Sequence, residues 1–444
     1  TIEAGQATLA LAVWGDWLAV GIGTYDSGKG RVAMYKRTVN SWELDGYLSD
    51  SHSNGGQFGA SLSMDGGLLA IGNPGATPCG VVDVYYLSED GTTWTHLPAL
   101  RLYAPDLVNG MDFGWAVTLT GTTLVACDPK HLTDKGICHK FSWDDSLKTM
   151  THAQQIEPAT LRVEWFGRAV SLDPVTGHVA VGQGEGTTGV RNVYVFEPDG
   201  TEHVVTTYNV NGGFGLSFSL FDGTLAVGAP ESSTGENSNA TNAGSVLVYK
   251  WSGTSYDLVQ TISNTSPGEQ FGYSVALYND VLITTKTSIS SADSVAVWTL
   301  DEATGQYVSS YHYEDTDAAR KSGLNAVTVD KGVRMGVPGD GFVAVAQAQA
   351  GGTQNSIITL EQRMYHRSGS WTAGYDGLSL TLKIGDTPVE GSHTLAQVTL
   401  EDGSMSGVTL SHSSDGVYSY PAGFLVPHGA TVTLGPLYMT NDSS

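Results

Sequence analysis

Hydrophobic and polar residues alternate in short segments along most of the chain, and tight turns separate these segments. In residues 214–230, FGLSFSLFDGTLAVGAP, every second residue from Leu216 to Leu220 is apolar and serines lie between them. This period of two predicts a strand with one buried face. Asp222-Gly223 predicts a hairpin turn, and a second strand follows before the sequence Gly-Ala-Pro.

The same strand–turn–strand pattern recurs about every fifty residues. Two copies, which begin at Ala7 and Ser322, lack the Phe-Gly pair that opens the others, and in each copy a third and a weaker fourth strand follow. Seven units of four strands predict a seven-bladed β-propeller, whose ring of blades leaves only short sheet edges. The five copies that open with Phe-Gly begin at Phe58, Phe113, Phe166, Phe214 and Phe271.

The pattern changes after the seventh unit. Five short alternating segments follow, such as LSLTLKI and LAQVTLE, with Gly- and Asp-rich turns between them. This spacing predicts a small antiparallel β-sandwich. The chain is therefore expected to be all-β, with a propeller over residues 1–365 and a β-sandwich-like domain over residues 366–444.

The cassette from Phe-Gly to Gly-Ala-Pro resembles the FG-GAP repeat of the integrin α-chain propeller and of many surface proteins. The resemblance covers residues 7–365 and implies that the phenylalanine packs between blades while the glycine permits close backbone approach. Many FG-GAP blades hold calcium in a long acidic loop between the first two strands. Here those turns carry about one Asp each, too few for the six to eight oxygens of a Ca²⁺ site. No metal or cofactor is expected, and the weak cation candidates are Glu314, Asp315 and Asp317.

Charge narrows the range of partners. The formal net charge is −24, which would repel phosphate backbones and anionic membranes. No apolar run reaches the ~18 residues of a membrane helix. The chain begins at Thr1, which suggests a removed leader or a longer precursor. These features favour an extracellular or cell-surface protein without nucleic-acid partners or membrane insertion.

The cysteines and the candidate glycosylation sites also bear on whether the protein is extracellular. Cys127 and Cys138 lie across a predicted hairpin, where a disulfide is possible in an oxidising compartment. Cys79 has no evident partner and is a candidate for a bond between molecules. Candidate glycosylation sites are Asn239, Asn264 and Asn441.

The long connections of the predicted propeller, between strands two and three and between successive blades, emerge on one face of the ring. Binding residues tend to lie on loops held by a rigid scaffold, so this face is the expected contact surface. Its partners would be other proteins of a surface assembly or copies of the same chain. The candidate contact residues are Tyr25, Asp26, Asp128, His131, Glu185, Glu231 and Glu236.

Sequence motifs of common catalytic sites are not evident. The chain has no Gly-x-Ser-x-Gly, His-Glu-x-x-His or Walker sequence. The sequence therefore favours a non-enzymatic adhesion or structural module. One alternative is a lectin-like propeller that binds carbohydrate, for which Trp14, Trp17 and Trp115 are the candidates for sugar stacking. The other is a glycan-active enzyme with two carboxylates at the central channel.

Overall fold

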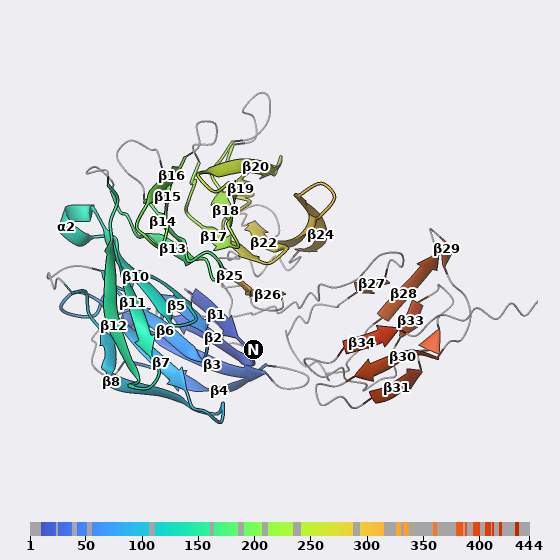
Figure 1. Cartoon of the computed structure of the whole chain (residues 1–444), viewed down its shortest axis with the longest axis horizontal. Coiled ribbons are helices and arrows are strands. Elements are labelled where there is room, and N and C mark those ends of the chain that lie inside the picture. Colours follow the sequence, from blue (N-terminus) through green and yellow to red (C-terminus); the bar gives the residue numbers. More distant parts are fainter. Residues whose placement is uncertain are drawn as a thin grey trace, which may run out of the picture. The chain divides into compact units, whose positions relative to one another are not determined.

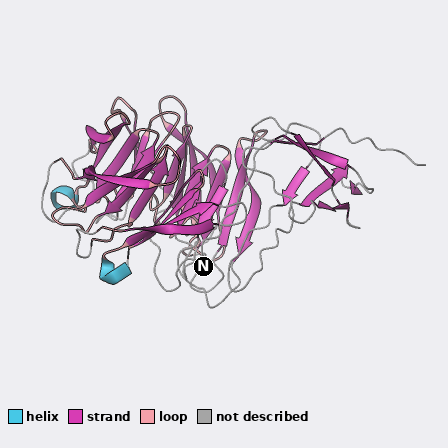
Figure 2. Cartoon of the chain, turned by 90° about the horizontal axis from the view of Figure 1, so that it is seen from below, coloured by secondary structure: helices cyan, strands magenta, loops and turns pink. Residues whose placement is uncertain are grey.

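The computed structural model shows an all-β chain that contains a β-propeller. It describes residues 10–23, 25–37, 42–50, 56–105, 112–159, 164–184, 191–206, 212–233, 241–286 and 294–314, and beyond these the strands β25 to β34. The chain divides into two compact units, residues 1–36 with 43–345, and residues 346–444 with 37–42. Strands make up most of the described chain, and the helices α1 and α2 are single turns in loops (Figure 2).

Six four-stranded antiparallel sheets form the blades, and in each blade the strands pair in chain order. The first three blades consist of β1 Ala10–Trp14, β2 Trp17–Ile22, β3 Arg31–Arg37 and β4 Trp42–Leu48; β5 Ser61–Asp65, β6 Leu68–Asn73, β7 Val81–Leu87 and β8 Trp94–Leu102; and β9 Ala116–Thr120, β10 Thr123–Asp128, β11 Ile137–Asp144 and β12 Thr149–Ile156. The next three consist of β13 Ala169–Leu172, β14 Val179–Gly182, β15 Val193–Phe196 and β16 Glu202–Val205; β17 Phe218–Phe221, β18 Thr224–Ala229, β19 Ser245–Trp251 and β20 Tyr256–Ser263; and β21 Val275–Tyr278, β22 Val281–Lys286, β23 Ser294–Asp301 and β24 Gln306–Glu314. The helical turns are α1 Tyr25–Gly28 and α2 His131–Asp134.

The first strand of each blade is the innermost, and these strands face a common centre (Figure 1). Successive inner strands contact one another from β1 through β5, β9, β13 and β17 to β21. Because the inner strands line the centre, their side chains define whatever space the ring encloses.

The expectation of seven blades is wrong, since the described residues form six four-stranded blades. The described part of the seventh unit is a two-stranded sheet of β25, Ala326–Val329, and β26, Val333–Gly336. Strand β25 contacts both β21 and β1, so this sheet lies between the last blade and the first. The segment expected as the outer strand contains β27, Ile358–Glu361, which pairs with β28, Ser379–Ile384, outside the propeller. That pairing removes the fourth strand that a seventh blade would need.

The Phe-Gly pairs lie where one blade meets the next. Each phenylalanine is buried in an apolar layer between two blades; Phe58, Phe113 and Phe166 have 0% exposure. The backbone N–H groups of Phe58, Phe113, Phe166 and Phe271 donate to the preceding blade, as from Phe113 N to Cys79 O at 3.0 Å. The residue beside that acceptor is Gly80, where a Cβ would overlap the Phe113 backbone. The aromatic ring therefore fills the layer, and the glycine lets two backbones touch.

The glycine of the second strand has a matching role. A Cβ on Gly72 would overlap the carbonyl oxygen of Gly114, the glycine of the next Phe-Gly pair. Gly21 meets Gly59 in the same way, and Gly228 meets Gly272. Close contact between glycines of adjacent blades thus explains why the glycine of the Phe-Gly pair and the glycine of the second strand both recur from blade to blade.

Two further features complete the fold. Cys127 and Cys138 are directly opposite each other in β10 and β11, and their sulfurs form a disulfide. In the second compact unit, β27, β28, β29 Thr387–Pro388, β32 Ser411–His412 and β33 Val417–Ser419 form one sheet, and β30 Thr394–Thr399, β31 Met405–Thr409 and β34 Thr431–Leu434 form another. The β-sandwich expected for residues 366–444 stays a prediction.

Candidate ligand site in the central channel

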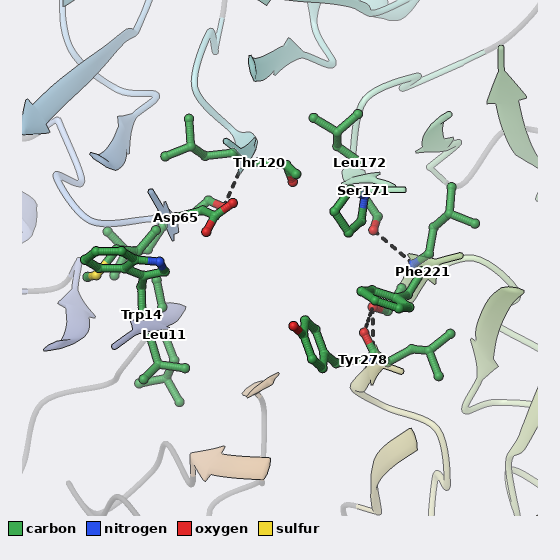
Figure 3. A pocket seen from close by; sticks show the side chains of 18 of the residues that line it. Leu11, Trp14, Asp65, Thr120, Ser171, Leu172, Phe221 and Tyr278 are labelled. Atoms are coloured by element: carbon green, nitrogen blue, oxygen red, sulfur yellow. Dashed lines mark hydrogen bonds between the residues drawn. The ribbon is translucent and has the colours of Figure 1, made fainter. Parts of the chain in front are cut away.

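A cavity of about 500 Å³ opens where the inner strands of all six blades end. Strands β1, β5, β9, β13, β17 and β21 each contribute side chains to its wall, and the turn after β13 adds Pro174 and Val175. Figure 3 shows the labelled side chains converging from several blades on one central space. This cavity is the central channel of the ring, and its volume falls within the range of small-ligand pockets.

Aromatic side chains stand at the mouth of this cavity. Trp14, Phe221 and Tyr278 are the last residues of β1, β17 and β21, so they occupy the same place in three blades. The Phe221 and Tyr278 rings lie 4.7 Å apart between centroids, with 49° between their planes. The Trp14 ring packs beside Gly67 in the next hairpin. All three side chains are partly exposed, so they present apolar faces to the cavity and to solvent.

Serines of the cavity wall are occupied by contacts between blades. Ser63 Oγ accepts a hydrogen bond from Leu119 N at 2.8 Å. Ser219 Oγ accepts one from Leu277 N at 3.0 Å, and Ser171 Oγ accepts one from Leu220 N at 3.0 Å. These bonds satisfy N–H groups on the inner edge of the neighbouring strand, which would otherwise be left without a partner. The serines therefore hold the ring together and are not the main groups for a ligand.

Asp65 is the acidic side chain of the wall. Its Oδ1 accepts from Gly66 N at 2.9 Å, and its Oδ2 accepts from Gly121 N in the next blade at 2.7 Å. Each carboxylate oxygen can accept a second hydrogen bond, and Thr120 lies beside it with a hydroxyl that faces the same space (Figure 3). Asp65 is thus fixed in position and still able to accept a donor from a ligand.

This arrangement combines aromatic faces with a fixed acceptor. Apolar C–H faces can stack on the aromatic rings, while Asp65 and Thr120 can bind hydroxyl groups. Among the described residues that line the cavity, Asp65 is the single carboxylate. The two-carboxylate arrangement of most glycosidases is therefore not formed by those residues.

The residues expected to contact partners do not gather at this cavity. Tyr25 stacks on Arg31, whose guanidinium carbon lies 3.7 Å from the ring centroid. Asp26 forms an exposed ion pair with Lys29 at 2.7 Å. Glu231 is exposed in the turn after β18. These three lie on the loop side, at the other end of the blades from the cavity mouth.

Asp128 and His131 are buried, with 0% and 5% exposure, so the expectation of accessible contact residues is corrected for both. The reason is a hydrogen-bonding role for Asp128, whose Oδ1 accepts from Asp112 N at 3.1 Å and from Lys130 N at 3.0 Å. Its Oδ2 is buried without a hydrogen-bond partner in the described part of the chain. Burial raises the pKa of Asp128 from 3.8 to about 6, although these backbone hydrogen bonds and nearby His131 oppose the rise.

This raised pKa predicts a pH-dependent stability. A carboxyl whose pKa is higher in the folded state stabilises the fold below its unfolded pKa, and this stabilisation is lost as the pH rises through its folded pKa. Relative to Asp128→Asn, which does not titrate, the wild type should lose about 2 kcal/mol of unfolding free energy between pH 4 and pH 7. Urea unfolding of both proteins across this range measures the difference. A difference that does not vary with pH would contradict the prediction.

Several other sequence predictions lie outside the described residues. These are Glu185, Glu236, Asp315, Asp317, Asn239 and Asn441; for Glu314 the structure describes only the backbone, at the end of β24. Within the described ranges, no group of three His, Cys, Asp or Glu side chains is placed to hold a metal ion.

Cys79 and Asn264 are both described. Cys79 is 1% exposed, so its sulfur could reach another molecule only after local opening of the fold. Asn264 Nδ2 donates to Glu269 Oε2 at 2.6 Å. A glycan on Asn264 would replace that hydrogen bond; whether it is attached stays a prediction.

The three tryptophans suggested for sugar stacking have different environments. Trp14 lines the channel cavity. Trp17 is 2% exposed and packs edge-on against Trp94, so burial removes it from the candidates. Trp115 is partly exposed on the loop side and contacts Arg168. Sequence reasoning missed Phe221, Tyr278 and Asp65, although their shared position at the end of a first strand was a usable signal.

Together the fold and the cavity define the chain as a β-propeller with a ligand-sized cavity in its central channel. No protein-family model matches the chain, and no curated protein matches it in sequence. Solved propellers resemble it in fold. Streptogramin B lyase is 11% identical, with a TM-score of 0.48 over 78% of this chain and 92% of that one. Sqt1 of Saccharomyces cerevisiae is 12% identical, with a TM-score of 0.45 over 81% and 94%. A putative 6-phosphogluconolactonase of Bacteroides fragilis is 14% identical, with a TM-score of 0.45 over 69% and 84%.

Two of these three proteins are named as enzymes, so the expectation that the chain is not an enzyme has no support from these propellers. The likeness concerns the fold alone, so it transfers neither a reaction nor a substrate to this chain. Among the described residues, no helix is long and apolar enough to span a membrane.

Proposed function

We propose that this protein is an extracellular carbohydrate-binding propeller whose ligand site is the central-channel cavity. The observation that carries the proposal is the aromatic mouth formed by Trp14, Phe221 and Tyr278 around the fixed carboxylate of Asp65. Sugars have apolar C–H faces and many hydroxyl groups. A site of aromatic faces with a few placed acceptors matches both properties.

The size of the cavity supports a small ligand unit. At about 500 Å³ it falls within the range of small-molecule pockets. The hydroxyl of Tyr278 points into the same space as Asp65 and Thr120 (Figure 3). One or two sugar rings at the end of a glycan chain would fill such a site, with a ring stacked on Trp14 or on the pair Phe221–Tyr278.

An extracellular setting belongs to the same proposal. The Cys127–Cys138 disulfide favours an oxidising compartment, and the net charge of −24 favours a soluble surface that repels anionic polymers. Kinship with FG-GAP surface proteins is also part of the proposal. It is supported by the Phe-Gly pairs at the contacts between blades, as at Gly80 and Phe113. Adhesion through the long loops remains a second proposal, and most of those loops lie outside the described residues.

A glycan array tests the proposed function. The full chain should bind a restricted set of neutral glycans, and a soluble form of the best glycan should compete for binding. Calorimetry would then measure affinity for the wild type and for Tyr278→Ala, with Tyr103→Ala as the control. Tyr103 is 41% exposed and does not line the cavity. Absence of binding to any glycan, or equal affinity for all three proteins, would contradict the proposal.

A further inference from the structure

A cluster of aromatic and ionisable side chains joins the fourth blade to the fifth, at the end of the blades where the channel cavity opens. Trp251, the last residue of β19, contacts two histidines of the fourth blade. Its ring centroid lies 5.1 Å from that of His178 and 4.8 Å from that of His203. His178 is 5% exposed, and its Nδ1 is hydrogen-bonded to the Tyr256 hydroxyl group at 2.8 Å. His203 Nε2 pairs with Glu197 Oε1 at 2.7 Å.

Hydrogen bonds connect this cluster to the channel mouth. The turn of residues 173–178, which ends at His178, contributes to the cavity wall. At the start of this turn, Asp173 Oδ2 accepts a hydrogen bond from Gly223 N at 2.8 Å, in the hairpin that follows β17. Gly223 O in turn accepts a hydrogen bond from Trp251 N at 2.7 Å. A movement within the cluster would therefore be passed to the hairpin that holds the aromatic end of β17.

The propeller does not require histidines at this contact. In the third blade Trp143 has the same position as Trp251, since its N–H donates to Thr122 O at 2.7 Å in the corresponding hairpin. Its aromatic neighbour from the preceding blade is Tyr86, with the ring centroids 6.2 Å apart. Histidine is the side chain whose charge ordinarily changes between about pH 5 and pH 8. Two histidines on Trp251 therefore give the contact of the fourth and fifth blades a response to acid that the fold itself does not demand.

Ionisable groups of both blades face His178. They are Asp173 of its own turn, Glu197 and His203 of the hairpin between β15 and β16, and Tyr256 of the fifth blade. Burial lowers the pKa of His178 below its ordinary value of 6.5, and His203 acts in the same direction, while Glu197 and Asp173 oppose the shift. A group whose pKa is lower in the folded state stabilises the fold above its unfolded pKa, and this stabilisation is lost as the pH falls through its folded pKa. Acid should therefore weaken this contact.

We propose that His178, His203 and Trp251 form an acid-sensitive latch between the fourth and fifth blades, which loosens the channel mouth when His178 gains a proton. A charge buried between the blades is costly unless it meets water or a close counter-charge. Separation of His178 from Trp251 would admit water, and it would also disturb the hydrogen bond from Gly223 to Asp173. The release of a channel ligand in acid rests on the proposed function, whereas the latch itself does not.

Amide hydrogen exchange of the full chain tests the latch without any ligand. The N–H groups of residues 222–223 donate to Asp173. Gly121 N, which donates to Asp65 between the second and third blades, is the matched control in the same sample. Between about pH 7 and about pH 4.5, the protection of residues 222–223 relative to that of Gly121 should fall about tenfold or more. The ratio cancels the intrinsic effect of pH on exchange, and an unchanged ratio would overturn the proposal.

Two variants separate the protonation of His178 from its packing. His178→Phe keeps an aromatic ring and cannot gain a proton, so the protection ratio should change by less than about twofold over the same pH range. Tyr256→Phe removes the hydrogen bond to His178 and leaves the histidine able to titrate, so the acid response should remain. An equal loss of protection in the wild type and in His178→Phe would contradict the proposal. Because no glycan takes part, failure of the latch and failure of the glycan array give different results.

Discussion

Replacing Gly72 with alanine is expected to destabilise the propeller by about 3 kcal/mol or more, as overpacking of a rigid contact does. The new methyl group would overlap the Gly114 carbonyl oxygen and Ser61 Oγ. Neither group can move aside easily. Gly114 N is hydrogen-bonded to Cys127 O at 3.0 Å, and Ser61 Oγ donates to Gly114 O at 2.8 Å. Unfolding in guanidinium chloride measures the change in free energy.

Gly46→Ala is the matched control for this experiment. Gly46 is also a strand residue, in β4, but a Cβ there would meet no atom within 4 Å. Its free energy of unfolding should change by less than about 1 kcal/mol. Equal effects at Gly72 and Gly46 would show that the contact between blades is not as close as the structure has it.

Truncation of Trp14 should have the largest effect on ligand binding. We expect Trp14→Ala to weaken the binding of the best neutral glycan about 30-fold, which corresponds to about 2 kcal/mol for the loss of an aromatic anchor. Trp14→Phe keeps a ring at the end of β1 and should recover most of the affinity. Titration calorimetry measures both variants.

Folding must be checked separately, because Trp14 also packs against the layer between the first two blades. The unfolding midpoint of each variant and its circular dichroism spectrum serve as this control. An affinity of Trp14→Ala within twofold of the wild type, in a protein that remains folded, would remove Trp14 from the site.

The alternation of residues and the recurring Phe-Gly pairs predicted the blades well, because both arise from local hairpins and from a contact repeated in each blade. The number of blades was not predictable in the same way. The last unit has Ser322-Gly323 in place of Phe-Gly, and its expected outer strand pairs with β28 instead. The strand with which a segment pairs depends on contacts between residues that are far apart in the sequence. A local sequence pattern does not contain this information.

The candidate site was only partly predictable for a related reason. Trp14 was a sequence candidate, whereas Phe221 and Tyr278 read as ordinary strand residues. Their convergence with Trp14 depends on closure of the ring, because Trp14 is more than 200 residues away from both in the sequence. The sequence predicts Asp128 as a loop residue because it follows an apolar strand. In the structure its carboxylate is buried and accepts hydrogen bonds from two backbone N–H groups.

A crystal structure of the full chain with its best neutral glycan bound would show directly whether the channel cavity is the ligand site. We expect electron density for a sugar ring in the channel mouth, stacked on Trp14 or on the pair Phe221–Tyr278, with a hydroxyl group donating to Asp65. A glycan bound elsewhere, with the channel mouth empty, would contradict this expectation.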